Sequence, residues 1–291
     1  MTEQMERIAV CLTSDKKVWY TLLLIAALAV LLAVLVIWSL LAASPEKTVE
    51  EDEEPEEEVR AWLVTARELE EMTYVDSQLG ELRWELTEES LEELDRVLRE
   101  YGITTPEAIS QFLAQAAVET AAGRYLTELG DEAYFNNYGY TTGTRGAGYL
   151  HLTFEYGQMA FAVWMMKREV PKLADIKYVN PVRHDEETVA ASYYAALRRA
   201  ANLGLDISEY SRIVYEEGSP VTTGADYIAE RFAWESAGYY WQTNGIGEAL
   251  SDTPGTGNTD EVSRLVGGGN WESRREAYEA YYPVLADKQL T

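Results

Sequence analysis

The sequence has little cysteine, little histidine and a shortage of positive charge. Cys11 is the single cysteine of 291 residues, so disulfides cannot stabilise the rest of the chain. For a domain outside the cytoplasm, this favours a bacterial surface over a eukaryotic secretory product. His151 has no second histidine nearby, and neither a metal site nor a cofactor is predicted. The formal net charge of −26 argues against nucleic acid and anionic lipid as partners.

One long run without charge is present near the N-terminus. Residues 18–43 are apolar apart from Thr21 and Ser39, and at 1.5 Å per residue a helix of this length crosses a ~30 Å hydrocarbon core. A cleaved signal peptide is the alternative, but its apolar region is usually about 7–15 residues long. Lys16 and Lys17 precede the run. The positive-inside rule therefore predicts a single-pass protein of the cell membrane, with residues 1–17 as a cytoplasmic tail and the remainder outside.

The chain after the predicted span divides into a linker, an ambiguous segment and a domain. Residues 44–60 contain the acidic run EEDEEPEEE, which repels itself and predicts an extended linker. Residues 61–85 are interpreted either as a stalk helix or as a lead-in that packs on the domain. Residues 86–291 are long enough for one well-filled core and form the predicted catalytic domain.

Hydrophobic periodicity predicts that this domain is mainly α-helical. Leu91, Leu94 and Leu98 form an apolar stripe between Thr87 and Tyr101, and Gly102 ends that helix. Thr105 and Pro106 then predict the start of another. Further helices are predicted at residues 159–168, 187–202, 226–240 and 260–265, the last leading into 274–282. The alternating residues 149–153 predict one short strand.

Two glutamates stand out at the end of the second predicted helix. The apolar run 109–118 brings Glu119 to a buried helix end, where desolvation and the helix dipole both raise the pKa of a carboxyl group. Glu119 is therefore a candidate general acid. Glu128 follows nine residues later and can face Glu119 only if the helix ends between them, which Gly123 allows. Two carboxyl groups across a cleft, with room for a water, are typical of inverting glycoside hydrolysis.

Four motifs in order carry a family resemblance. They are FLAQAAVET (112–120), RGAGYLHLT (145–153), WESAGYYW (234–241) and GGGNWESRR (267–275). Together they resemble the chitinase-like, family-19 glycoside hydrolases, which include plant-type chitinases and phage endolysins that cut peptidoglycan. The likeness runs over residues 86–282. It implies a lysozyme-like, two-lobed helical domain with a small β element, here preceded by one transmembrane helix.

The resemblance also implies residue roles. Glu119 corresponds to the catalytic acid, and Glu128 has the spacing of the second acid in phage-type lysozymes. Thr153 stands where relatives hold the attacking water. Contacts with substrate are implied for Tyr149, His151, Tyr156, Asn270 and Arg274.

Some positions depart from the family pattern and leave alternatives open. His151 stands in place of a glutamine, and Gly157 and Val266 each stand in place of an asparagine, which puts the substrate in doubt more than the chemistry. The loop carrying the second acid is shortened between Asn137 and Thr144. Other acids close to that loop are Asp131, Glu132 and Glu155.

These observations predict a membrane-tethered hydrolase that cleaves β-1,4 bonds in peptidoglycan or another β-1,4-linked N-acetylhexosamine glycan, by an inverting acid/base mechanism without a cofactor. Three alternatives remain: a chitinase, a lytic transglycosylase, and a non-catalytic protein that binds wall glycan or acts as a scaffold on a degenerate hydrolase fold. Protein partners are not predicted.

Overall fold

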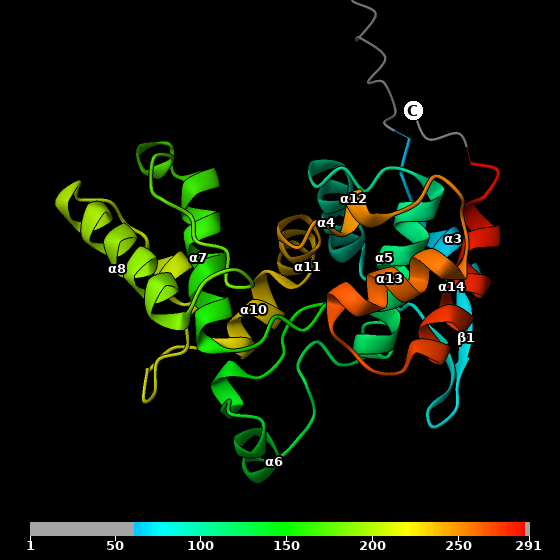
Figure 1. Ribbon diagram of the computed structural model, residues 1–291, viewed down its shortest axis with the longest axis horizontal. Helices are drawn as coiled ribbons and strands as arrows, with labels where there is room; N and C mark the ends of the chain where they lie inside the picture. The colour runs from blue at the N-terminus through cyan, green and yellow to red at the C-terminus, as the bar shows by residue number, and fades with distance from the viewer. Residues whose placement is uncertain (1–60, 289–291) are drawn as a thin grey trace, which may run out of the picture. The chain divides into compact units, whose positions relative to one another are not determined.

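The computed structural model describes residues 61–288, and in them the fold is mainly helical (Figure 1). The predicted cytoplasmic tail 1–17, membrane span 18–43 and acidic linker 44–60 lie outside the described residues. Within residues 61–288, no helix has both the length and the apolar character needed to cross a membrane.

The described elements are twelve α-helices, two short 3₁₀ helices and one two-stranded sheet. In chain order they are α3 (Ala66–Glu71), β1 (Thr73–Asp76), β2 (Gly80–Arg83), α4 (Glu88–Glu100), α5 (Pro106–Thr120), α6 (Glu132–Asn137), η1 (Thr142–Thr144), α7 (Glu155–Glu169), η2 (Pro171–Leu173), α8 (Glu186–Asn202), α9 (Ser208–Ser211), α10 (Ala225–Arg231), α11 (Ala233–Thr243), α12 (Ile246–Ala249), α13 (Thr256–Val266) and α14 (Trp271–Leu285).

Helix α5 lies at the centre of the group of helices on the right of Figure 1. It begins as predicted, because the Thr105 side chain accepts a hydrogen bond from the Ala108 N–H and Pro106 occupies the first turn. Helices α13 and α14 pack on it, and β1 packs on α14. Nearly every residue of α5 is buried, so this helix fixes its two ends firmly in the domain.

Residues 61–85, left undecided by the sequence, pack on the helical domain. β1 and β2 pair antiparallel, with Thr73 opposite Arg83 and Asp76 opposite Gly80. Apolar side chains of the segment are buried in the main core, and they include Leu63, Val64, Leu69, Met72, Leu82 and Trp84. The segment is therefore part of the same folded unit and not a separate stalk.

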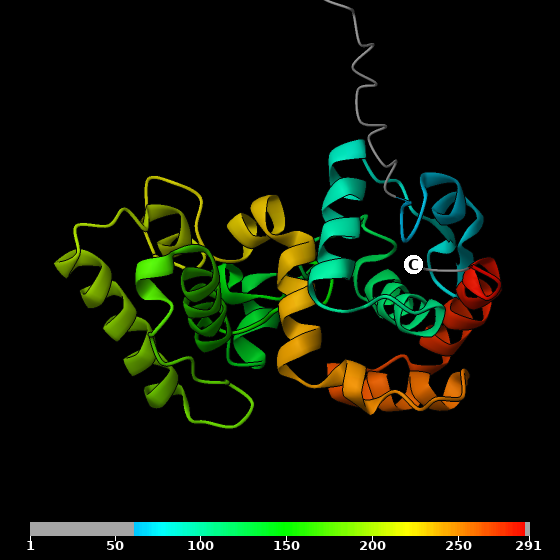
Figure 2. The ribbon, with the colours of Figure 1, turned by 90° about the horizontal axis from the view of Figure 1, so that it is seen from above.

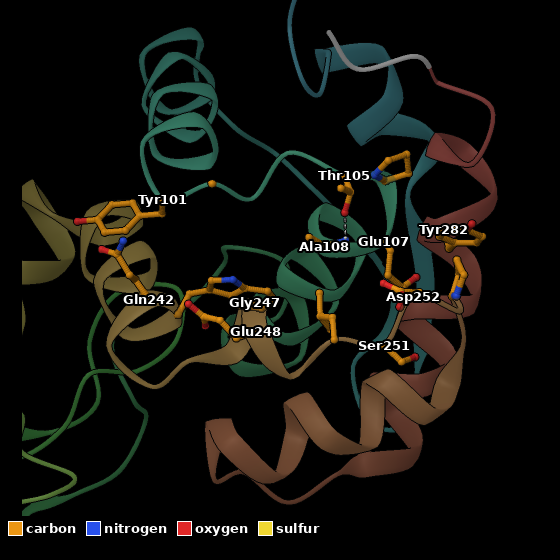
Figure 3. Close-up of a pocket in the computed structure, with 15 residues that line it drawn as sticks. Tyr101, Thr105, Glu107, Ala108, Gln242, Gly247, Glu248, Ser251, Asp252 and Tyr282 are labelled. Atoms are coloured by element: carbon orange, nitrogen blue, oxygen red, sulfur yellow. Dashed lines mark hydrogen bonds between the residues drawn. The ribbon is translucent and has the colours of Figure 1, made fainter.

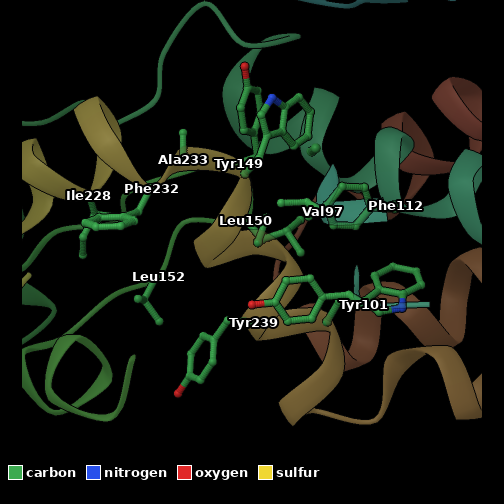
Figure 4. Packing of buried hydrophobic residues seen from close by; sticks show 14 of the residues in the cluster. Val97, Tyr101, Phe112, Tyr149, Leu150, Leu152, Ile228, Phe232, Ala233 and Tyr239 are labelled. Atoms are coloured by element: carbon green, nitrogen blue, oxygen red, sulfur yellow. The ribbon is translucent and has the colours of Figure 1, made fainter. Parts of the chain in front are cut away.

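Helices α7, α8, α9 and α10 form a second group, and α11 lies between the two groups in both views (Figures 1 and 2). The sequence predicted one helix over residues 226–240, which is wrong: the chain breaks at Phe232, between α10 and α11. Figure 4 shows apolar side chains near α11, among them Tyr149, Leu150 and Phe112. The Tyr149 ring stacks on Trp234, with ring centroids 3.3 Å apart.

A buried charge network joins α11 to both groups. Glu235 of α11 accepts hydrogen bonds from Arg96 of α4 and from Arg168 of α7, each at 2.5 Å, and from the Tyr101 hydroxyl. Because these contacts come from three helices, they restrain the separation of the two groups around α11.

Candidate active site

Helix α5 ends immediately after Glu119, as the spacing of the two glutamates requires. Ala121 and Ala122 both adopt left-handed backbone conformations, with φ of 50° and 56°, and Gly123 follows with φ of 86°. The Thr120 hydroxyl accepts from the Gly123 N–H at 2.8 Å and closes the turn. Alanines in this conformation carry strain, which is often found at functional sites. The chain thus reverses between Glu119 and Glu128.

The Glu119 carboxylate is held by two cationic or potentially cationic groups. Oε1 pairs with Nη2 of Arg274 from α14, and Oε2 lies 3.4 Å from Nδ1 of His151. The Glu119 side chain is 18% exposed, whereas that of Arg274 is only 2% exposed. Arg274 also donates to the Gln115 carboxamide and to the Gly269 carbonyl oxygen. Arg274 is therefore a buried partner of Glu119, and it is Arg275 that lies at the surface with Asp260.

The predicted rise in the pKa of Glu119 is wrong. Burial raises this pKa, but the hydrogen bond from His151 and the positive charge of Arg274 outweigh it, so the pKa is lowered overall. The sequence argument considered desolvation and the helix dipole, but not a guanidinium from the other end of the domain. Without substrate, Glu119 is consequently a carboxylate at neutral pH.

Glu128 lies beside the turn formed by residues 145–153. Its N–H donates to the Gly146 carbonyl at 2.8 Å, and the Gly146 N–H donates to its Oε2 at 3.2 Å. The Tyr140 hydroxyl donates to Oε1 at 2.8 Å, and the Tyr134 hydroxyl donates to the same atom at 3.3 Å. Burial and this contact with Glu128 raise the pKa of Tyr140. The three groups that contact the Glu128 carboxyl oxygens, the Gly146 N–H and the two tyrosine hydroxyls, are all donors, and a carboxylate can only accept.

The strand predicted at residues 149–153 is wrong, because this segment forms a tight turn. Ala147 and Leu152 exchange two backbone hydrogen bonds of 3.1 and 2.8 Å, and Ala147 also bridges to Thr127. Gly148 and His151 have φ of 75° and 45°, which no regular strand contains. The only sheet of the described residues is the β1–β2 hairpin.

The backbone at Gly146 and Gly148 lies close to neighbouring segments. A Cβ atom on Gly146 would lie 2.8 Å from the His151 Cβ and 3.3 Å from Glu128 Oε2, and one on Gly148 would lie 2.9 Å from the Ala233 carbonyl oxygen. His151 and Glu128 thus meet across a backbone that has no room for a side chain at position 146.

A cavity of about 340 Å³ begins beside His151. Thr153 lines it, and its hydroxyl donates to the His151 carbonyl at 2.7 Å. Tyr156 also lines it and stacks on Phe154, with ring centroids 5.1 Å apart. The cavity therefore combines hydrogen-bonding groups with aromatic faces, as a sugar site does.

Two predicted substrate contacts lie elsewhere. Tyr149 is 3% exposed in the core, and burial raises its pKa to about 12, so its position favours packing over the predicted contact with a sugar. Asn270 is exposed at the start of α14 in a left-handed conformation, with φ of 56°. Its carbonyl accepts from the Arg274 N–H at 3.2 Å, so it supports the turn that leads to Arg274.

Three residues near Glu119 were missed by the sequence reasoning. Gln115 precedes Glu119 by one helical turn, so its place on the same face could have been inferred. A Cβ atom on Gly268 would lie 2.8 Å from Glu119 Oε1, and only the GGG run hinted at such proximity. Tyr240 lines the cavity and donates to the Val266 carbonyl at 3.2 Å. Burial and the nearby charge of Glu119 raise its pKa.

A larger cavity of about 660 Å³ lies at the opposite end of α5, about 18 Å away along the helix (Figure 3). Its buried acid, Glu107, accepts hydrogen bonds from Tyr278 at 2.5 Å, Asn258 at 2.7 Å and Gln111 at 3.0 Å. Since neutral donors satisfy this carboxylate, Glu107 joins α5, α13 and α14 without offering a reactive group to the cavity.

Comparison with known proteins adds no assignment: no family model, curated protein or solved structure matches the chain. The relation to the family-19 hydrolases stays a resemblance. In the part of the chain that the structure describes, no three His, Cys, Asp or Glu side chains are grouped so that they could hold a metal ion.

Proposed function

We propose that the protein is a glycoside hydrolase that cleaves β-1,4 bonds between N-acetylhexosamines, with peptidoglycan as its first candidate substrate. One observation carries this proposal. Glu119 and Glu128 contact the same turn, the former through His151 and the latter through Gly146, and this turn borders the 340 Å³ cavity. Neither carboxyl group lines the cavity itself, but both contact the turn that borders it, and a pair of carboxyl groups at a sugar site is what glycoside hydrolysis requires.

In the proposed mechanism, Glu119 protonates the glycosidic oxygen and Glu128 removes a proton from the attacking water. The donors around Glu128 keep it an acceptor, as a base requires. The Thr153 hydroxyl donates its hydrogen bond to the His151 carbonyl oxygen, so the lone pairs of the hydroxyl oxygen can accept a hydrogen bond from the water and orient it. Attack from the opposite ring face inverts the configuration.

The finer architecture and location belong to the same proposal. We take the two groups of helices to be the lobes of a lysozyme-like domain, with the catalytic turn between them. The tether is residues 18–43, with the N-terminus in the cytoplasm and the domain on the wall side of the membrane. An enzyme for free chitin would more naturally be released, so tethering favours peptidoglycan over chitin.

The second candidate is a non-catalytic protein that binds wall glycan. The lowered pKa of Glu119 favours it, because a general acid must carry a proton. The substitutions at His151, Gly157 and Val266 favour it as well, because relatives use those positions to hold the sugar.

The deciding experiment measures products released by the purified full chain from peptidoglycan and, separately, from chitin oligomers. Glu119→Gln and Glu128→Gln are compared with Glu132→Gln and Glu155→Gln, which remove the other candidate acids near the shortened loop between Asn137 and Thr144. We expect reducing ends from peptidoglycan with the wild type and with the two control variants, and none with the first two.

Any other result of this experiment supports one of the alternative functions or assigns the base to another residue. Binding without turnover by the wild type identifies the glycan-binding protein, and anhydromuramyl products identify a transglycosylase. If Glu128→Gln keeps its activity while Glu132→Gln or Glu155→Gln loses it, the general base is the glutamate whose replacement abolishes activity. Full activity in Glu119→Gln ends the hydrolase proposal.

A further inference from the structure

His151 lies between the two candidate acids. Its Nδ1 is 3.4 Å from Glu119 Oε2, and its Cβ packs against Gly146, whose N–H donates to Glu128 Oε2. The family that the sequence resembles usually has a glutamine here, and a glutamine cannot carry a transferable proton at neutral pH. The replacement therefore changes what position 151 can do chemically.

The conformation of His151 is held by its surroundings. Its φ of 45° is uncommon for a residue other than glycine, and its N–H donates to Gly148 at 3.2 Å while its carbonyl accepts from Thr153. The side chain is 16% exposed and lines the 340 Å³ cavity. Its Nε2 is buried and has no hydrogen-bond partner among the described residues. One ring nitrogen thus faces Glu119, and the other is buried without a partner among the described residues.

The ionisable groups around the ring come from four elements. Glu119 of α5 faces Nδ1, and Arg274 of α14 lies on the other side of that carboxylate. Glu128 lies across Gly146. The remaining groups are the neutral tyrosines Tyr156 of α7 and Tyr240 of α11, which line the same cavity. A proton on the imidazole would therefore face the Glu119 carboxylate, whose other partner is the Arg274 guanidinium.

We propose that His151 stores the proton that Glu119 delivers to the leaving group, so that the catalytic acid is the His151–Glu119 pair and not Glu119 alone. The proposal rests on the hydrolase function proposed above. It explains how a carboxylate that is paired with Arg274 can still act as an acid. Histidine is the one side chain whose ordinary titration range lies near neutral pH.

The proton transfers balance as follows. The Nδ1–H bond of the imidazolium breaks as an O–H bond forms on Glu119, and this O–H then breaks as the glycosidic oxygen takes the proton and its bond to the anomeric carbon is cleaved. Water bonds to that carbon and gives its proton to Glu128. His151 ends neutral and Glu128 protonated, and solvent returns the proton from Glu128 to His151.

The test compares His151→Asn with His184→Asn in the full chain. Asparagine tolerates a left-handed backbone, so the first variant preserves the turn, and the exposed His184 serves as the matched control. We expect His151→Asn to lower kcat at pH 7 by about 10²-fold with little change in KM, and to move the pH optimum toward acid, where Glu119 takes its proton from solvent. Exogenous imidazole should restore part of the activity of His151→Ala. His184→Asn should match the wild type.

Three results would contradict the proposal in different ways. A wild type that is active, with an unchanged pH profile in His151→Asn, rejects the proton store and leaves the hydrolase standing. A loss of thermal stability in His151→Asn with the wild-type pH profile assigns His151 a structural role only. A wild type that is inert on every glycan rejects the hydrolase and this proposal together.

Discussion

Glu119 and Glu235 are both paired with arginine, yet Glu235 is buried and Glu119 is only partly buried. For each, burial raises the pKa, and hydrogen bonds and nearby positive charge more than offset it, so both pKa values are lowered. The Glu235 side chain is 2% exposed, and that of Glu119 is 18% exposed. Glu235 joins three helices, whereas Glu119 joins two helices and the turn beside a cavity.

The difference shows which property sets the candidate acid apart from a structural glutamate. Ion pairing and a shifted pKa are common to both glutamates, so neither property identifies a site. What distinguishes Glu119 is that one of its partners, His151, also borders open space. Arg96 and Arg168, the partners of Glu235, instead pair with Glu100 as well, which extends a structural network.

The largest expected effect separates the two glutamates by activity. Glu119→Gln should lower turnover by about 10²–10⁴-fold, because it removes a general acid. Glu235→Gln should leave the turnover per folded molecule near the wild-type value, because Glu235 does not line the cavity and its partners are the structural arginines Arg96 and Arg168. Steady-state rates, normalised to the folded fraction by circular dichroism, provide the check. Equal losses of turnover in both variants would show that contact with a cavity-lining residue does not distinguish Glu119 from Glu235.

The next largest effect is a difference in stability between variants of two adjacent arginines, Arg274 and Arg275. Arg274→Met leaves the Glu119 carboxylate buried without its guanidinium, and we expect a loss of about 3–5 kcal/mol in the free energy of unfolding. Arg275→Met removes only a surface contact with Asp260 and should have little effect. Urea unfolding measures both. An Arg274→Met variant as stable as the wild type would mean that the ion pair is not formed in solution.

A smaller effect is expected in the glycine run that leads to α14. A Cβ atom on Gly268 would collide with Arg274 and Glu119, so Gly268→Ala should cost about 1–3 kcal/mol through overpacking and should also lower turnover. Gly269 has nothing within 4 Å of such an atom, which makes Gly269→Ala the control. The idea fails if the two variants unfold at the same urea concentration.

The smallest effect is a dependence of stability on pH. Glu119 and Glu235 have folded-state pKa values below the ordinary 4.5, so they stabilise the fold above that pH, and this contribution is lost as the pH falls through the lowered values. Glu235→Gln should therefore flatten the acid limb of a stability profile. Burial raises the pKa of Glu93 to about 7, so this residue acts in the opposite sense, and Glu93→Gln should be relatively more stable above pH 7. Urea midpoints between pH 3 and pH 8 test both signs.

Local sequence signals predicted the helices well where a cap marks the boundary. Thr105 caps α5 as predicted, Thr87 caps α4 in the same way, and both helices begin at the following residue. No glycine or proline near Phe232 predicts the break between α10 and α11. There the Phe232 ring packs against Tyr227 of α10 and against Phe161, which is distant in sequence, so a long-range contact accompanies the interruption of the helical pattern.

The candidate site was predictable in position but not in its electrostatics. The nine-residue spacing and Gly123 correctly indicated a helix end between Glu119 and Glu128. The sign of the pKa shift of Glu119 could not be inferred, because it depends on the docking of Arg274 against α5. The alternation at residues 149–153 suggested a strand, since a polar and apolar pattern does not reveal a backbone with positive φ at His151.

The ion pair between Glu119 and Arg274 joins residues that are 155 positions apart. During synthesis at ~5–20 residues per second, α5 therefore leaves the ribosome roughly 8–30 s before its arginine. Until α14 docks, the carboxylate has neither its guanidinium nor the covering backbone of Gly268. A nascent chain, or one truncated before α14, therefore lacks the assembled Glu119–Arg274 pair, and the proposed activity has to wait until α14, the last helix of the described residues, has docked.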